Sequence, residues 1–560
     1  MASLCRAILC RRRSLHAKAL LKLCIDMNAL DENQDGPPGQ PEIQDATEVV
    51  KNVGSKATFT RNSIISMLRL FVTAGIALVL PGYLTHKMPI KTYAAWVLIL
   101  QVSSYVSYLD FGIQTAISKF VAEYRVKQDA AGLNMRASAG LLLMLLAGAL
   151  GIVLTLILAW CAPQLFHDIP SDLYGDIRVS IILVGISLSL GLVFSIFSSI
   201  FLGLQRFTVP MIIGIVNRFL FTGMVLGAAA YHLSLATMGA LVAFTNVFTG
   251  LLQFEAWRRW GRSVRLSLAS IDRSVVRKMF VYCSSLAIWN GAMLFISGLD
   301  LTIVGRYDFG QTAFYSVAAL PMTFGISIMG AALAPLMPTT SALSVLRTPE
   351  QMGMLLAKVT RYASILLIVS SIPLLVGGYW MLRIWVGPTY ATNAIGYLRI
   401  LVIANVLRNM CMPYASMLVA TDNQKVGIFC AIAEAVVNLT SSIYLGRRFG
   451  AIGVAYGTLI GSFVSVGVHF VFNMHFTYSQ FSISRTRLFL NGLARPFLIA
   501  LPSLLLFRLW WLTTPPALTL PMWTALVLST LLIAWFIALD SGERTSLVHM
   551  AGTRLMLRTR

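Results

Sequence analysis

The stretch from Ala137 to Cys161 decides the fold class: it reads ASAGLLLMLLAGALGIVLTLILAWC and contains no charged side chain. A helix of about 20 apolar residues crosses the hydrocarbon core of a bilayer, so this stretch is long enough to span a membrane. A transmembrane barrel strand would instead alternate apolar and polar residues over about 10 positions. The run therefore predicts a membrane-spanning α-helix.

Runs of this kind fill most of the 560-residue chain, of which 57% is hydrophobic and only 12% is charged. Soluble proteins contain roughly 45–50% apolar and about 25% charged residues, so this composition excludes a water-soluble enzyme. The length rule for apolar runs predicts an all-α polytopic membrane protein with about fourteen spans. Their expected limits are Ile64–Leu84, Tyr93–Ser118, Ala137–Cys161, Val179–Leu204, Val209–Tyr231, Met238–Phe254, Phe280–Val304, Ala313–Met337, Tyr362–Ile384, Ala394–Val419, Val426–Leu445, Ala451–Phe472, Leu488–Leu509 and Met522–Leu539.

The charged residues divide the chain into regions. The net charge is +22, and the basic loops all follow even-numbered spans, with Arg447 and Arg448 as the main exception. This pattern predicts cytoplasmic termini and contact with anionic membrane lipids rather than with nucleic acid. We expect a disordered cytoplasmic extension (1–60), a six-helix lobe (61–255), a basic cytoplasmic linker (256–279), a second six-helix lobe (280–478), a last pair of spans (485–540) and a basic cytoplasmic tail (541–560). An organelle transit peptide and an early start codon are the alternatives for the extension.

An internal repeat supports the two lobes. Gly203–Phe207 (GLQRF) precedes the fifth span and Met238–Ala240 (MGA) opens the sixth, whereas Asp422–Lys425 (DNQK) and Ile452–Val454 (IGV) stand at the starts of the eleventh and twelfth. The offset between the two sets is roughly 214–218 residues. Transporters commonly place the substrate site between such repeats.

Three stretches carry a resemblance to a known family. They are Tyr108–Ile113 (YLDFGI) with Lys119–Arg125 (KFVAEYR), Gly298–Gly305 (GLDLTIVG) with Tyr315–Val317 (YSV), and Ile384–Tyr390 (IWVGPTY) with Ala420–Lys425 (ATDNQK). In order and spacing they resemble the polysaccharide-biosynthesis, or O-antigen, flippase family of the multidrug/oligosaccharidyl-lipid/polysaccharide exporter superfamily. The resemblance covers about residues 63–476, and the last two spans fit the fourteen-span members of the family.

This resemblance implies a function. Such proteins carry polyprenyl-pyrophosphate-linked oligosaccharides across the bacterial inner membrane, through a central cavity between two lobes that opens alternately to each side. The partners implied are the lipid-linked oligosaccharide and a polysaccharide polymerase or export complex. The alternatives are a multidrug or cation antiporter of the same superfamily, a peptidoglycan-precursor flippase, and a membrane enzyme or accessory subunit of polysaccharide assembly.

Ionisable residues inside spans are costly and tend to face cavities. Arg218 and Glu434 each lie about ten residues into a span and are separated by the repeat offset, so the repeat places opposite charges at equivalent positions. Two interpretations stay open: a cavity pair in which Arg218 binds pyrophosphate, and a permanent structural ion pair. Asn405 and Arg408 share a helical face, which suits phosphate or sugar hydroxyls or, alternatively, a hydrogen bond between lobes.

The remaining candidates lie nearer the ends of spans. Arg69 is expected close to the head groups, where it snorkels to the interface and can still meet substrate. Asp300 is expected to bind a coupling cation, to cap a gate or to pair with Arg306. Asp110, Lys119 and Glu123 are expected to form a gate network.

The sequence also lacks several motifs of catalysis. It has no G-x-x-x-x-G-K-[ST] loop, no cluster of metal ligands and no nucleophile beside a base. We therefore expect no enzyme activity, no cofactor and no metal site. Gly453, Gly457 and Gly461 repeat every four residues, and small residues at this spacing predict close packing of two helices.

Overall fold

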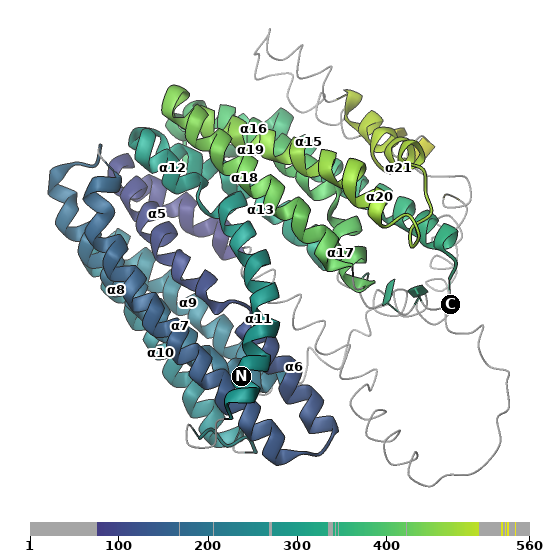
Figure 1. Ribbon diagram of the computed structural model, residues 1–560. Coiled ribbons are helices and arrows are strands. Elements are labelled where there is room, and N and C mark those ends of the chain that lie inside the picture. Colours follow the sequence, from purple (N-terminus) through teal and green to yellow (C-terminus); the bar gives the residue numbers. More distant parts are fainter. Residues whose placement is uncertain are drawn as a thin grey trace, which may run out of the picture. The chain divides into compact units, whose positions relative to one another are not determined.

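The computed structural model describes residues 75–502, apart from gaps at 167, 205, 262, 268–271, 334–335, 337–339, 342, 345–346 and 422, and a few residues between 528 and 544. Every regular element within these residues is helical (Figure 1). The predicted extension (1–60), the basic tail and most of the last two predicted spans lie outside the described residues.

Eleven described stretches are long and apolar enough to cross a membrane, and each coincides with a predicted span. The prediction of a polytopic all-α membrane protein is confirmed. Part of the first predicted span is described as a helix over residues 75–87. The observed helices are longer than the apolar runs: α15 has 38 residues and begins at Pro349, whereas its apolar run begins at Tyr362. At 1.5 Å per residue it is about 57 Å long, so hydropathy detects only its membrane-embedded part.

The helices form two groups that follow one another in sequence. The N-terminal group consists of α5 (Ile90–Ser104), α6 (Ile113–Val126), α7 (Ala130–Leu165), α8 (Tyr174–Gly203), α9 (Thr208–Ala230) and α10 (Leu235–Trp260). The C-terminal group consists of α11 (Arg273–Met293), α12 (Asp300–Tyr307), α13 (Thr312–Leu333), α15 (Pro349–Val386), α16 (Pro388–Met410), α17 (Met412–Ala420), α18 (Gln424–Phe449), α19 (Ala451–Val468) and α20 (Met474–Phe476). The short helices α21 (Arg485–Leu488) and α22 (Arg495–Phe497) follow.

Irregular turns interrupt several of the spans that the structure describes. A 3₁₀ turn, η1 (Tyr105–Asp110), joins α5 to α6, and a π turn, η4 (Leu294–Gly298), joins α11 to α12. Further π turns are η6 (His469–Asn473), between α19 and α20, and η7 (Phe489–Ala494), between α21 and α22. π turns occur frequently at functional sites.

Local sequence explains where several helices begin. Thr348 and Gln351 form a reciprocal capping box at the start of α15, and Pro349 stands in its first turn. Such a box satisfies backbone N–H groups that lack a partner inside the helix. Gly450, with φ +63°, makes the tight turn from α18 to α19, and a Cβ there would lie 2.4 Å from the Asp308 carboxylate. The turn therefore requires glycine.

The apolar core is continuous at one end of the bundle and divided at the other. We call the end that carries the connections α6–α7, α8–α9 and α10–α11 the basic end. A large cluster at the opposite end and in the middle joins residues of both groups, among them Tyr93 and Val242 with Phe314 and Tyr390. At the basic end the two groups have separate clusters, one around Ile117 and Ile200 and one around Leu356 and Met417.

The span formed by α11 and α12 contacts both groups. Val275, Met279 and Cys283 of α11 belong to the basic-end cluster of the N-terminal group, whereas α12 packs on α18 and α19. The connection before it is fixed to α7, because the Arg265 and Ser267 amides donate to Asn134 and Ser138. This span therefore crosses from one group to the other along its length.

The glycine repeat of α19 makes the close approach that its spacing predicts. A Cβ on Gly453 would lie 2.1 Å from the Leu445 carbonyl oxygen, and one on Gly457 would lie 2.5 Å from the Ser442 amide nitrogen. These are backbone atoms of α18, so the two helix backbones nearly touch. Small residues allow such contacts where no hydrophobic force holds helices together.

We predict that Gly457→Ala lowers the thermal stability of the purified protein, because α18 and α19 must separate; overpacking costs about 1–3 kcal/mol. Gly467→Ala in the same helix is the matched control, since a Cβ there meets nothing within 4 Å. Thermal unfolding in detergent compares the two. Equal melting temperatures would show that the close packing does not stabilise the fold.

Candidate substrate cavity and its ion pair

A cavity of about 360 Å³ lies among helices of both groups. Its volume falls in the range of about 300–1,000 Å³ that small-molecule sites occupy. Most of its wall is aliphatic and aromatic, including Leu84, Trp96, Leu320 and Leu401. Its polar lining comes from Gln101, Asp300, Ser316, Thr323, Asn405, Arg408 and Thr458.

Three predicted site residues line this cavity together: Asp300, Asn405 and Arg408. Asp300 is the first residue of α12, where the helix dipole favours a carboxylate. Arg408 and Asn405 lie one turn apart near the end of α16. That helix is interrupted after Met410, and Pro413 stands in the first turn of α17. Proline lacks the N–H that would continue the helical ladder.

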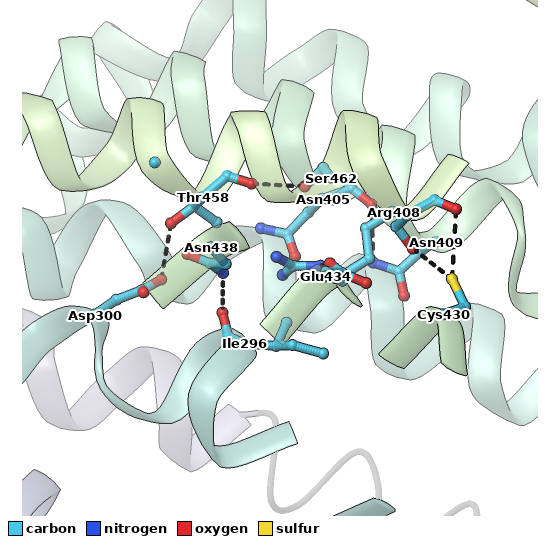
Figure 2. Close-up of polar contacts among 12 residues, drawn as sticks. Ile296, Asp300, Asn405, Arg408, Asn409, Cys430, Glu434, Asn438, Thr458 and Ser462 are labelled. Atoms are coloured by element: carbon cyan, nitrogen blue, oxygen red, sulfur yellow. Dashed lines mark hydrogen bonds and ion pairs between the residues drawn. The ribbon is translucent and has the colours of Figure 1, made fainter. Parts of the chain in front are cut away.

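Arg408 forms an ion pair with Glu434 of α18 (Figure 2). The side chains are 15% and 5% exposed, respectively, and Glu434 does not line the cavity. The carboxylate therefore holds the guanidinium from behind the cavity wall. Nη2 of Arg408 is buried and has no hydrogen-bond partner among the described residues.

The structure thus gives Glu434 a partner that the repeat did not indicate. The repeat placed Glu434 opposite Arg218, whereas its observed partner is Arg408, from the preceding span. Arg218 lies at an exposed position of α9, and its backbone oxygen accepts from Thr222 at 2.7 Å. Sequence periodicity cannot reveal such pairs, because they depend on how neighbouring helices rotate against each other.

Asp300 has a different partner from Arg306, the one that proximity in sequence suggested. Its Oδ2 accepts a hydrogen bond from Thr458 Oγ1 of α19 at 3.0 Å (Figure 2). Asp300 is 9% exposed, whereas Arg306 is exposed. The neighbouring acid Asp308 caps α19 instead, by accepting from the Ala451 amide at 3.2 Å.

The predicted gate residues Asp110, Lys119 and Glu123 lie apart from this cavity. Asp110 accepts from the Gln114 amide at 3.2 Å and so begins α6. Lys119 Nζ lies 4.4 Å from the centre of the Tyr282 ring on α11. Glu123 pairs with Lys127 at 2.6 Å on the exposed face of α6. Arg69 lies outside the described residues, and Arg495 lies in α22.

Two amides that we did not predict as site residues support the π turn η4. Gln101 Nε2 donates to the Gly298 carbonyl at 2.7 Å, and Asn438 Nδ2 donates to the Ile296 carbonyl (Figure 2). One amide comes from each helix group. The sequence does contain a signal for both residues, since each is a single amide inside an apolar run. Such a side chain needs a hydrogen-bond partner in the membrane.

A contact between two helices distant in sequence lies at the end of the bundle opposite the basic end. Trp385 Nε1 donates to the Leu78 carbonyl at 2.5 Å. A Cβ on Gly82 would lie 2.9 Å from the Trp385 indole, so the helix over residues 75–87 rests directly on this ring. Nearby, the Tyr93 and Tyr390 rings meet edge to face at 6.2 Å. We call Leu78, Gly82 and Trp385 the latch.

Comparisons with known proteins agree on this fold. The structure is similar to that described as "Lipid II flippase MurJ, inward closed conformation", with a TM-score of 0.64, 14% identity and coverage of 85% of this chain and 98% of the other. It is also similar to an inward-facing multidrug resistance MATE family transporter of the MOP superfamily, with a TM-score of 0.59, 16% identity and coverage of 75% of this chain and 99% of the other. A third similar structure is that of a MOP superfamily transporter from Pyrococcus furiosus, with a TM-score of 0.54, 17% identity and coverage of 75% of this chain and 96% of the other. Its description states a reversed polarity of the binding pocket.

No protein-family model matches the chain, and no curated protein matches it. At 14–17% identity the structural likenesses establish the fold, which is that of MOP superfamily transporters. They show this fold alone and do not single out the O-antigen flippases that the sequence motifs resemble. The protein is a multi-pass membrane protein with this fold.

We predict that Glu434→Leu and Arg408→Leu each destabilise the protein strongly, because either leaves one buried charge without its partner; such losses cost about 3–5 kcal/mol. The double variant should recover most of that loss. Thermal unfolding of the full chain in detergent measures all three. A double variant as unstable as the sum of the singles would contradict a direct pair.

Proposed function

We propose that the protein is an alternating-access flippase that moves a polyprenyl-pyrophosphate-linked oligosaccharide across a bacterial inner membrane. Residues 61–255 and 280–478 form its two lobes, and the basic end faces the cytoplasm. A lipid II flippase and multidrug transporters share the fold. Transport between two lobes fits a cavity lined by both helix groups.

The proposal rests on the position of Arg408 in the cavity wall and on its hydrogen-bond partners. A guanidinium has five N–H donors and binds phosphate through a two-pronged fork. Here the carboxylate of Glu434 binds Nε, and Nη2 has no described partner. Glu434 thus orients Arg408 toward the cavity and keeps it neutralised when no anion is bound. A pyrophosphate in the cavity would compete with Glu434 for the same guanidinium, while Asn405 supplies an amide beside it.

The division of the apolar core supports a direction of access. The groups share one core at the latch end and have separate cores at the basic end. We infer a state closed at the outer side and separable at the cytoplasmic side, where a lipid-linked substrate is made available. Asp300 keeps its predicted role in coupling or gating: its bond to Thr458 joins α12 to α19, and a cation or proton at Asp300 would weaken that bond.

One observation favours the cation exporter as a second candidate. Asp300 on the cavity wall and Glu434 behind it give two carboxylates to the single guanidinium of Arg408, and the rest of the wall is largely apolar. An apolar pocket with an excess of acid suits an organic cation. A peptidoglycan-precursor flippase would use the same groups as the leading proposal, since its substrate also carries a pyrophosphate.

Depletion of the protein should cause one lipid-linked oligosaccharide to accumulate, which mass spectrometry of extracted lipids identifies. Arg408→Ala should fail to reverse the accumulation, whereas Arg306→Ala, at an exposed position, should reverse it fully. Accumulated peptidoglycan precursor would instead assign that substrate. Sensitivity to cationic drugs without any accumulated saccharide would overturn the proposal in favour of the exporter.

We predict that Gly82→Val opens the latch, because its side chain displaces the Trp385 indole. The readout is labelling of a cysteine at Ser316, which lines the cavity and is 7% exposed, by a membrane-impermeant maleimide. The exposed Cys161 and the N-terminal Cys5, Cys10 and Cys24 are replaced by serine. Labelling should rise several-fold. Gly75→Val in the same helix is the control, since a Cβ there meets nothing within 4 Å. Equal labelling in both variants would show that the latch does not close this path.

A further inference from the structure

A second buried polar cluster lies in the basic-end core of the C-terminal group. His469 and Asn473 are the first and last residues of the π turn η6. His469 is 7% exposed and Asn473 is fully buried. Neither lines the substrate cavity. An ionisable side chain within a membrane-spanning helix is by default a candidate functional group.

The hydrogen bonds around His469 leave acceptors unused. Asn473 Nδ2 and His469 Nδ1 are 2.9 Å apart, which satisfies a neutral imidazole at that nitrogen. Asn473 Oδ1 and Thr360 Oγ1 are buried and have no hydrogen-bond partner among the described residues. The Tyr414 ring meets the imidazole edge to face at 5.5 Å, and its hydroxyl lies 2.6 Å from Thr477 Oγ1.

A small cavity of about 10 Å³ is lined by both Thr360 and His469. That volume holds about one water molecule. A neutral imidazole donates one hydrogen bond, whereas an imidazolium donates two. The unused acceptors and the space for one water would therefore accept the second N–H that protonation adds to the ring.

We infer that His469 is a proton-binding site, with Asn473, Thr360 and one water receiving the N–H groups of the imidazolium. The proton comes from water at the basic end and adds to the Nδ1 lone pair, and no bond between heavier atoms changes. The Asn473 amide turns over, so that Oδ1 accepts the new N–H. The use of this proton to drive transport rests on the function proposed above.

The charges around His469 determine which conformation the binding of a proton favours. The titratable or charged groups on the elements packed around His469 include Tyr414, Cys411, Cys430, Glu434, Lys358, Arg361, Tyr362, His475, Arg485, Arg487 and Arg495. No carboxylate among the described residues lines the small cavity. Burying an imidazolium without a counter-charge is costly, so proton uptake favours a conformation in which water reaches the cluster.

The cluster is connected to the substrate cavity through one helix. Thr458, which binds Asp300, lies three turns before His469 on the same span. The π turns η6 and η7 both contribute to the small cavity, through Phe470 and Leu493. Rearrangement of these turns on proton binding would move α19 and thereby the bond between Thr458 and Asp300.

Nuclear magnetic resonance of the full chain in lipid nanodiscs, with ¹⁵N-labelled histidine, tests the site directly; the chain has seven histidines. The signal absent from His469→Gln should titrate reversibly as the pH is lowered. Asn473→Asp should raise its midpoint by about 1–3 units, because the carboxylate favours the imidazolium. His475→Gln, at an exposed position, is the control that leaves this signal unchanged. A signal that stays neutral down to the lowest pH at which the protein remains folded would overturn the inference.

Spin labels at Lys127→Cys and Glu350→Cys test the conformational consequence in a background without other accessible cysteines. Both positions are exposed at the basic end, one in each group. The distance distribution should shift with acidification in the parent protein and not in His469→Gln. If the distances shift equally in both, His469 does not control the conformation and the inference fails.

A transport assay distinguishes failure of this inference from failure of the proposed function. Proteoliposomes that move no pyrophosphate-linked saccharide at any pH, while His469 still titrates, would refute the flippase and leave the proton site standing. Transport with an unchanged pH profile in His469→Gln would refute coupling through His469 and leave the flippase standing.

Discussion

The constraint on which this structure depends is the absence of water around a helix in the membrane. An unsatisfied backbone group in hydrocarbon costs several kcal/mol, so a span can be interrupted only where another side chain covers the break. The π turn η4 meets this requirement with two amides, Gln101 from the N-terminal group and Asn438 from the C-terminal group. The break in this span is therefore also a point of contact between the two groups, and movement of either group acts on it.

The same constraint explains what the sequence could predict. Apolar runs are long and continuous in a membrane protein, so the eleven described spans were all located from hydropathy. The repeat of Gly453, Gly457 and Gly461 correctly predicted a close helix contact, because glycine spacing maps directly onto one face. The start of α15 could not be predicted from hydropathy, because its polar first turns precede the apolar run.

Partners between helices could not be predicted in the same way. Residue spacing places Asn405 and Arg408 on one face, and the structure does bring both to one cavity. It did not reveal that Glu434 binds Arg408, or that Asp300 binds Thr458, because these bonds depend on the rotation and depth of separate helices. Gln101 and Asn438 were single amides in apolar runs, and only their contacts with η4 give them a role.

The ion pair sets the electrostatics of the candidate site. An unpaired arginine would make the cavity strongly attractive to anions and costly to bury. With Glu434 behind it, Arg408 is neutralised in the empty site, and Asp300 adds a further acid on the cavity wall. An anionic substrate must therefore displace a carboxylate. Its binding free energy is then the difference between the free energies of two ion pairs, Arg408 with the substrate and Arg408 with Glu434. Such an exchange makes affinity sensitive to the position of α18, which α19 fixes through its glycines. Substrate binding at Arg408 and movement of α19 would thus be two consequences of the same helix contact.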